Sequence, residues 1–369
     1  VAAAVAAGRC RVVVPSANAD EARLVPGAEV VAASCLAEVA LAYGAESADP
    51  GPLGPVAAHE DPPAPAPAVD LAEVIGQGQA RWGLEVAAAG GHHLLMVGPP
   101  GAGKTMLAAR LPGLLPDLEE QEAVEVTAVH SLAGTFRPVD GLVRRPPFED
   151  PHHTATAAAI IGGGSGLPRP GAASRAHRGV LFLDEAPEFG TRVLQTLRQP
   201  LEHGELVIHR SAGSARFPAR FQLVLAANPC PCGRAVGKGL DCTCAPMARR
   251  RYFSRLSGPL LDRVDLQIEV LPVPRVDRAA PEAEGTGTVA ARVAEARGRA
   301  RARLRSTPWA TNAEVSGSWL RAHADGIDAQ ADLDRALDRG TLSLRGADRV
   351  LRVAWTLADL AGRDRPGRL

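Results

Sequence analysis

The sequence predicts an α/β protein with a parallel β-sheet and a separate helical region at its C-terminal end. Short apolar runs at His93–Val97, Val180–Leu183 and Gln222–Ala227 have the length of buried strands, and helical stretches separate them. This alternation is typical of a parallel sheet that carries helices on its faces. After Pro274 the composition changes to Ala, Arg and Asp at helical spacing, which predicts the helical region.

A small αβ piece is expected ahead of this sheet, in residues 1–49. The apolar run Val12–Val14 and the segment Glu29–Ala33 are predicted strands, and Pro15–Asn18 is a predicted turn between them. A helix is expected near Cys35–Tyr43.

The rest of the chain divides into three segments. Residues 50–68 contain seven prolines and predict an extended, semi-rigid linker. The α/β core is expected at 69–275 and the helical subdomain at 276–369. The chain begins at Val1, in what reads as the middle of a domain, so we expect a fragment or an incomplete gene model.

Charge and hydropathy narrow the class of protein. Because 41 basic residues balance 41 acidic ones, contact with a nucleic acid would need a local basic patch. There is no apolar run of transmembrane length and no signal-peptide pattern, so no membrane contact is expected. Six cysteines beside a motor-like nucleotide site favour a reducing cytoplasm.

The stretch GPPGAGKT follows the first predicted strand and opens a predicted helix. Only two lysines occur in the chain, one of them in this stretch, whereas the other 39 basic residues are arginines. The stretch fits the phosphate-binding loop of P-loop NTPases, in which glycines let backbone N–H groups wrap a polyphosphate. A compact ammonium would reach the β- and γ-phosphates better than a guanidinium. The predicted nucleotide contacts are Gly98, Pro99, Pro100, Gly101, Ala102, Gly103, Lys104 and Thr105, with Thr105 also a ligand of Mg²⁺.

Two further predicted strands end in polar residues. The strand at 180–183 is followed by Asp184, expected to hold the Mg²⁺ shell, and by Glu185, expected to orient or deprotonate the attacking water. Asn228 follows the strand at 222–227 and would bond the water or the γ-phosphate. The alternatives are an ordinary strand end and a turn-forming Asn before Pro229. In this order after a phosphate loop, the residues indicate an AAA+ ATPase.

Such an ATPase needs an arginine from a neighbouring subunit to stabilise charge on the γ-phosphoryl group. Arg263 precedes a predicted strand within Ser254–Leu266 and is the best candidate, with Arg255 second. Because arginine is abundant in this chain, we assign this role from the position of the residue within the segment and not from its type.

Four cysteines follow Asn228 in two C-x-C pairs, Cys230, Cys232, Cys242 and Cys244. Two nearby thiolate pairs can satisfy tetrahedral Zn²⁺, and the polar loop between them is long enough to fold back. The usual zinc knuckle is C-x-x-C, so non-ligating thiols and redox disulfides remain alternatives.

These motifs resemble the magnesium-chelatase-like AAA+ ATPases of the YifB/ComM group. The resemblance covers nearly all of residues 69–271, and its specific stretches are 74–105, 151–164, 176–189, 197–205, 218–233 and 252–266. Residues 9–49 are similar to the end of the Lon-protease-like (S5-like) N-terminal domain of that group. No protease activity is expected, because no lysine precedes Lys104 to complete a Ser–Lys pair.

The resemblance assigns roles to single residues. It implies that Lys104 and Thr105 contact phosphate and Mg²⁺, that Asp184 and Glu185 are the acidic pair, and that Asn228 is the first sensor. Two arginines are added, Arg263 as the arginine finger and Arg345, in the segment 342–360, as the second sensor. The implied cofactors are ATP and Mg²⁺.

The resemblance also implies a hexamer that moves DNA through its pore, as a helicase or branch-migration motor in recombination or natural transformation. One alternative is a chelatase-type motor that drives Mg²⁺ insertion into a porphyrin. Another is a fragment that binds nucleotide without turnover. Loop arginines that would contact DNA phosphates, or simply be solvated, are Arg144, Arg145, Arg210, Arg216 and Arg220.

Two adjacent histidines precede a predicted helix. His152 and His153 suggest contact with a metal or phosphate, whereas the alternative is a polar loop around the helix start with Thr154 as its cap. The basic run Arg292–Arg305 is expected to be an exposed helix face.

Overall fold

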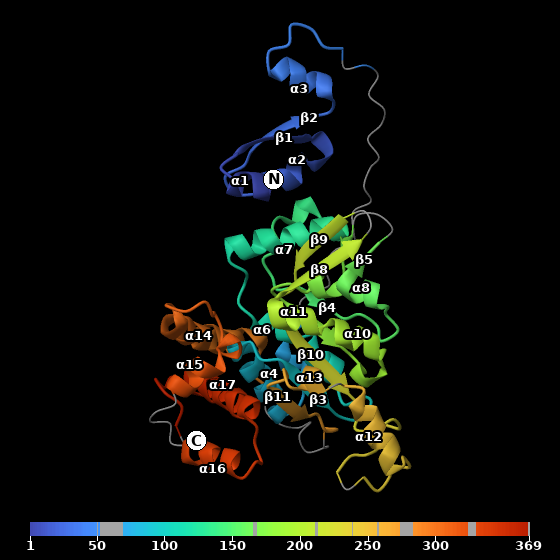
Figure 1. Cartoon of the computed structure of the whole chain (residues 1–369), viewed down its shortest axis with the longest axis vertical. Coiled ribbons are helices and arrows are strands. Elements are labelled where there is room, and N and C mark those ends of the chain that lie inside the picture. Colours follow the sequence, from blue (N-terminus) through green and yellow to red (C-terminus); the bar gives the residue numbers. More distant parts are fainter. Residues whose placement is uncertain are drawn as a thin grey trace. The chain divides into compact units, whose positions relative to one another are not determined.

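The computed structural model describes residues 1–49, 51, 69–164, 168–210, 213–237, 239–256, 258–273, 283–323 and 330–367. Apart from Gly51, the expected linker at 50–68 lies outside the described residues, as does the expected boundary at 275–276. The chain divides into two compact units, one formed by Val1–Ala66 with Leu118–Arg144 and the other by Pro67–Asp117 with Arg145–Leu369 (Figure 1).

The first unit contains a pair of parallel strands, β1 (Arg11–Pro15) and β2 (Glu29–Ala33), with Val13 opposite Val31. Between them the chain forms a short 3₁₀ turn and a helix that buries Ala19 and Ala22. The helices of this αβ piece are α1 (Ala2–Ala6), α2 (Ala19–Arg23) and α3 (Leu36–Ala42).

The same unit includes helix α7 (Glu120–Ala133), although it lies in the middle of the chain. The carboxylate of Glu122 accepts a hydrogen bond from the backbone N–H of Glu119 and so caps the first turn. Gly134, with φ of 74°, ends the helix in the left-handed conformation that glycine adopts without strain. Leu118, Ala123 and Val126 form the small core beneath it.

The second unit is built on a five-stranded, fully parallel sheet with the strand order β11-β3-β10-β7-β4. The strands predicted at 180–183 and 222–227 have those bounds, and the first predicted strand begins one residue later, at Leu94. The strands are β3 (Leu94–Val97), β4 (Phe148–Glu149), β7 (Val180–Leu183), β10 (Gln222–Ala227) and β11 (Leu266–Glu269).

Both faces of the sheet are covered, which explains why its inner strands read as continuous apolar runs. Alternate residues point to opposite faces, so Phe182 belongs to one core and Leu181 and Leu183 to the other. The first core also contains α4 (Gly78–Gly90), α5 (Lys104–Ala108) and α6 (Leu111–Leu114). Helices that contribute to the second are α8 (Ala157–Ile161), α9 (Ala172–Arg175), α10 (Thr191–Thr196), α11 (Arg198–His203) and α13 (Gly258–Leu261).

Two antiparallel hairpins interrupt this layout. One pairs β5 (Gly162–Gly163) with β6 (Arg169–Pro170), and the longer one pairs β8 (Glu205–Arg210) with β9 (Gly213–Pro218). Helix α12 (Pro246–Ser254) follows the cysteine-bearing segment.

The C-terminal region is helical, as predicted. Figure 1 shows its helices gathered beside the sheet, and their own small core includes Leu304, Leu351 and Trp355. The helices are α14 (Thr286–Leu304), α15 (Gly317–Ala322), α16 (Gln330–Asp338) and α17 (Leu344–Leu360). Among the described residues, no helix combines the length and the apolar character that crossing a membrane requires.

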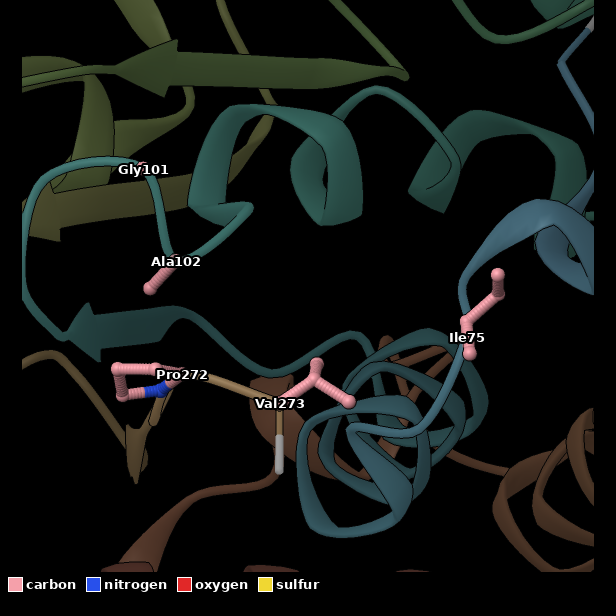
Figure 2. Close-up of a pocket in the computed structure, with 5 residues that line it drawn as sticks. All are labelled: Ile75, Gly101, Ala102, Pro272 and Val273. Atoms are coloured by element: carbon pink, nitrogen blue, oxygen red, sulfur yellow. The ribbon is translucent and has the colours of Figure 1, made fainter. Parts of the chain in front are cut away.

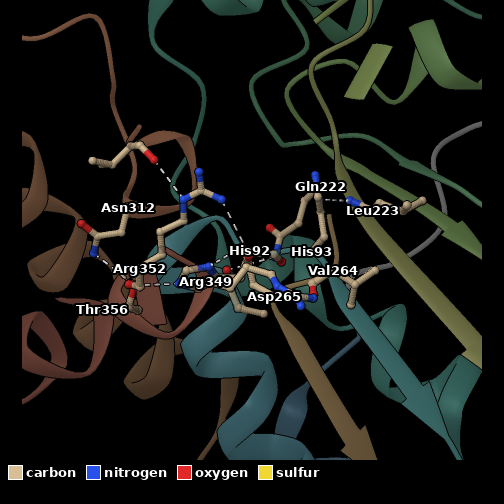
Figure 3. A network of polar contacts seen from close by, with 12 residues as sticks. His92, His93, Gln222, Leu223, Val264, Asp265, Asn312, Arg349, Arg352 and Thr356 are labelled. Atoms are coloured by element: carbon tan, nitrogen blue, oxygen red, sulfur yellow. Dashed lines mark hydrogen bonds and ion pairs between the residues drawn. The ribbon is translucent and has the colours of Figure 1, made fainter. Parts of the chain in front are cut away.

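A buried polar network joins α17 to the sheet (Figure 3). The two ring nitrogens of His92 lie 2.9 Å from Asp265 Oδ2 and 2.7 Å from Thr356 Oγ1. A Cβ on Gly90 would lie 2.1 Å from His92 Nε2, so only glycine leaves room for this arrangement. Nearby, burial lowers the pKa of His93 to about 4, which suits an Nδ1 that accepts the backbone N–H of Leu223.

Candidate nucleotide-binding and hydrolysis site

The phosphate loop connects the end of β3, inside the sheet, to the start of α5. Gly98 passes so close to β11 that a Cβ there would lie 2.1 Å from the carbonyl oxygen of Val270. Gly103 has φ of 91°, which turns the backbone sharply before Lys104. Glycine is therefore required at Gly98 by the close approach of β11 and favoured at Gly103 by the backbone conformation.

Lys104 is nearly buried, with 7% of the residue exposed. Its Nζ donates to the carbonyl oxygens of Gly98 at 2.7 Å and Pro99 at 3.0 Å, and to Asn228 Oδ1 at 3.2 Å. Loss of hydration lowers the pKa of Lys104, while the negative charges of Asp184 and Glu185 oppose this shift. The structure thus brings Lys104 and Asn228 together, although they are 124 residues apart.

Thr105 and Asp184 also meet. Thr105 Oγ1 donates to Asp184 Oδ2 at 2.6 Å, and the backbone N–H of Glu185 donates to Asp184 Oδ1 at 2.8 Å. A hydroxyl and a carboxylate are hard oxygen donors of the kind that Mg²⁺ takes beside nucleotide phosphates, so these two side chains fit that ion.

Glu185 follows Asp184 in an unusual backbone conformation for a residue with a side chain, with φ of 49°. Its Oε2 lies 3.2 Å from Nδ1 of His153. His153 stacks on His152, whose own Nδ1 bonds Thr154 Oγ1 at 2.8 Å. The cap of the following helix is Thr156 rather than Thr154, since Thr156 Oγ1 accepts from the backbone N–H of Ala159.

Two contacts here were not foreseen from the sequence. His153 reaches Glu185 because β4, which precedes it, pairs with β7, which precedes Glu185. Tyr252 of α12 accepts the backbone N–H of Asn228 at 3.3 Å, and burial raises the pKa of this tyrosine to about 12. The two adjacent histidines before a predicted helix were a signal for the first contact, whereas a lone tyrosine offered none for the second.

A pocket of about 310 Å³ lies beside the phosphate loop (Figure 2). It was not predicted, although Ile75 belongs to a stretch that carried the family resemblance. Gln77 secures one side of it by donating to the carbonyl oxygens of Ala102 at 3.1 Å and Leu271 at 2.6 Å. The residues that line it are Ile75, Gly101, Ala102, Pro272 and Val273.

The three candidate arginines lie elsewhere. Arg263 forms an ion pair with Glu202, and Arg255 donates to Glu188 Oε2 at 2.8 Å. Arg345, at the start of α17, lies 3.4 Å from Asp262 Oδ2 and is 80% exposed at its side chain. Within the described part of this single chain, neither Arg263 nor Arg345 is bonded to the phosphate loop.

The four cysteines converge in the segment between Asn228 and α12. Their sulfur atoms all lie within 4.8 Å of one another, and none of them is in a disulfide. The backbone N–H of Arg234 and the neighbouring Cys230 thiol lower the pKa of Cys232 to about 6.

The loop arginines have mixed surroundings. Arg216, on β9, lies 3.4 Å from a carboxylate oxygen of Glu205 across the longer hairpin, and 71% of its side chain is exposed. Nothing is described for the side chain of Arg210. In α14, Arg292 is bound by the buried Glu85 and by Glu284, so this end of the basic run is part of a packed contact rather than a solvated face.

Two family profiles match the chain. The profile described as magnesium chelatase, subunit ChlI matches residues 70–278, and the profile for the C-terminal part of that subunit matches residues 283–369.

Three relatives place these matches in context. An uncharacterized protein of Mycobacterium tuberculosis, Rv2897c, is 52% identical over 357 residues, which are 96% of this chain and 70% of the relative. The uncharacterized protein YifB of Escherichia coli is 45% identical, over 79% of this chain and 56% of YifB. The competence protein ComM of Haemophilus influenzae is 43% identical, over 80% of this chain and 57% of ComM.

Proposed function

Because this chain belongs to the family of magnesium chelatase subunit ChlI, in the group that includes YifB and ComM, we propose that it is an AAA+ ATPase that acts on DNA. The observation that carries the proposal is the meeting of Lys104, Asn228 and the Thr105–Asp184 pair at the ends of β3, β10 and β7. Carboxyl ends of neighbouring parallel strands are where α/β sheets bind their ligands.

Each residue has a defined task in the proposed reaction. Lys104 and the backbone of the phosphate loop bind the β- and γ-phosphates, and Thr105 and Asp184 hold Mg²⁺, which neutralises charge between the phosphates. Glu185 orients the attacking water and accepts its proton, while Asn228 positions the water or the γ-phosphate. The pocket at Ile75 takes the nucleoside part of ATP.

The proposed assembly is a hexameric ring. In it, Arg263 reaches the site of a neighbouring subunit and stabilises the transferring γ-phosphoryl group, and Arg345 senses nucleotide from the helical lid. The loop arginines contact DNA phosphates in the pore. Such a motor belongs in the cytoplasm, where ATP is available and thiols stay reduced.

The biological role proposed is helicase or branch-migration work during recombination or natural transformation. It rests on the resemblance to the YifB/ComM group, one of whose members is named a competence protein. A chelatase-type motor for metal insertion and a nucleotide-binding chain without turnover are the rival functions.

The test is ATP hydrolysis with and without branched DNA. We expect DNA to stimulate turnover, and Glu185→Gln to lower turnover by roughly 10²- to 10⁴-fold, as loss of a general base does, while ATP binding persists. Glu188→Gln is the matched control, because Glu188 lies three residues further on and pairs with Arg255. Tight ATP binding with no turnover in the unmodified protein would favour a nucleotide-binding chain without turnover. Turnover that does not change when DNA is added would favour a chelatase-type motor.

A further inference from the structure

We infer that Cys230, Cys232, Cys242 and Cys244 form a structural Zn²⁺ site that fastens the segment after β10 to the phosphate loop. All four sulfur atoms lie within 4.8 Å of one another, and they come from two C-x-C pairs that are ten residues apart. Convergence of four thiols from two separate turns is a geometric fact that the sequence spacing alone left open.

The sulfur–sulfur distances fit a tetrahedron around zinc. A Zn–S bond of about 2.3 Å implies an S···S distance of roughly 3.8 Å at the tetrahedron's edge. The distances are 3.3 Å between Cys230 and Cys232, 3.8 Å between Cys232 and Cys242, and 3.6 Å between Cys242 and Cys230. A disulfide needs about 2.0 Å and joins sulfurs in pairs, whereas three of these thiols are mutual neighbours.

The local backbone also supports a zinc site. The N–H of Gly233 donates to the carbonyl oxygen of Cys230 at 2.9 Å, and the N–H of Cys242 donates to that of Gly239 at 3.1 Å. The first pair therefore lies within a closed turn, and Cys242 of the second pair lies at the end of another. Four sulfur donors without a carboxylate select a soft or borderline ion such as Zn²⁺ over Mg²⁺ or Ca²⁺.

This site is connected to the nucleotide site by short contacts. Asn228, two residues before Cys230, bonds Lys104, and Tyr252 beyond the last cysteine bonds the backbone of Asn228. Next to Cys232, a Cβ on Gly233 would lie 2.5 Å from Cδ of Pro100, so the cysteine segment lies directly against the phosphate loop. Zinc would thus fix the position of Asn228 and Pro100, and this consequence rests on the proposed ATPase function.

The metal itself is tested on the whole 369-residue chain without nucleotide. Elemental analysis of the purified protein is expected to find about one zinc per chain. The double variant Cys232→Ser with Cys244→Ser should lose the zinc, whereas the matched control Cys10→Ser with Cys35→Ser should keep it, because those cysteines lie outside the cluster. No bound metal, iron in place of zinc, or zinc retained by the first variant would each overturn the inference.

A second measurement does not depend on the folding of a variant. A thiol-reactive reagent should modify at most Cys10 and Cys35 in the native protein, and also Cys232, Cys242 and Cys244 after a zinc chelator is added. Modification of Cys232, Cys242 and Cys244 before chelation would contradict the site.

The link to turnover is tested separately. Removal of zinc by the chelator, followed by exchange into Mg²⁺-containing buffer, is expected to lower ATP hydrolysis, and added Zn²⁺ to restore it. Unchanged hydrolysis without zinc would overturn the link but leave the metal site standing. If the protein never hydrolyses ATP, the proposed function fails, and the zinc content still decides the metal site.

Discussion

At the residue scale, the surroundings of Lys104 explain why a lysine suits this position better than an arginine. Its ammonium fits among two loop carbonyls and the amide oxygen of Asn228, in a position with 7% of the residue exposed. A planar guanidinium with five donors would leave several of them unsatisfied in this space. The motif predicted a phosphate-binding lysine at this position, whereas its contact with Asn228 depends on β3 and β10 being neighbours in the sheet.

Glu185 is the residue whose surroundings differ most from the expectation. Its carboxylate is paired with His153 rather than free, and the pair is partly exposed, with 48% of the Glu185 side chain accessible. A partly exposed contact of this kind, which is an ion pair only when His153 is protonated, is worth at most about 1 kcal/mol. The pair therefore can restrain Glu185 without locking it.

We predict that His153→Ala raises ATP turnover in the absence of DNA, by up to about fivefold, because the carboxylate no longer has to leave a partner before it orients water. Steady-state ATPase assays measure this directly. His152→Ala is the control, since the neighbouring ring bonds Thr154 instead. A fall in turnover for His153→Ala alone would mean that His153 positions Glu185 rather than restrains it.

At the element scale, the segment from β10 to α12 is the connection between the cysteine cluster and the nucleotide site. Gly233 has φ of 74° and abuts Pro100, whereas Gly239 has φ of 66° and its nearest neighbour, Cα of Ala235, would be 3.9 Å from a new Cβ. The two glycines share a left-handed backbone but differ in the space around them.

Gly233→Ala is therefore predicted to weaken ATP binding and Gly239→Ala to leave it nearly unchanged. Both changes carry a backbone cost of roughly 1–2 kcal/mol, and the first adds an overpacking cost of about 1–3 kcal/mol against the phosphate loop. Calorimetric titration with ATP and thermal unfolding measure the two effects. Equal losses of ATP affinity in the two variants would refute a direct contact with Pro100.

Elements differed in how far their sequence predicted them. The inner strands β7 and β10 were predictable to the residue, because burial on both faces makes them apolar apart from Gln222, and polar residues follow them. The two-residue β4 carries too short a pattern to be recognised. The grouping of α7 with the N-terminal piece depends on contacts between distant segments that no local pattern records.

At the scale of the whole molecule, helix α17 connects the C-terminal helical region, which we call the lid, to the segment that bears the proposed arginine finger. Arg349 donates to the carbonyl oxygens of Leu261 and Val264 at 3.2 and 3.0 Å, and Arg345 pairs with Asp262. The backbone on both sides of Arg263 is therefore held by the lid of the same chain.

Mixing two inactive variants tests whether Arg263 acts between subunits. Lys104→Ala subunits should bind ATP poorly but still present Arg263, and Arg263→Ala subunits should bind ATP but lack the finger. In randomly mixed rings roughly a quarter of the interfaces combine an intact phosphate loop with an intact finger, so we expect up to that share of normal turnover.

The control for this experiment is a mixture of Lys104→Ala with the double variant Lys104→Ala, Arg263→Ala, which has no intact phosphate loop. A measurement of molecular mass confirms that the subunits assemble. If the first mixture shows no recovery in assembled rings, Arg263 does not act between subunits.

The sequence by itself predicted the fold class and the helical C-terminal region, which the structure confirms, and it placed the proposed phosphate loop, acidic pair and Asn228 at the ends of predicted strands. These follow from local features, namely glycine and lysine spacing, apolar runs of strand length and helical periodicity, which neighbouring residues carry. The tertiary structure alone decided that His153 meets Glu185, that Tyr252 supports Asn228, and that four cysteine sulfurs converge against the phosphate loop. These contacts depend on the order of strands in the sheet and on how connecting segments fold back, because both bring together residues far apart in the chain.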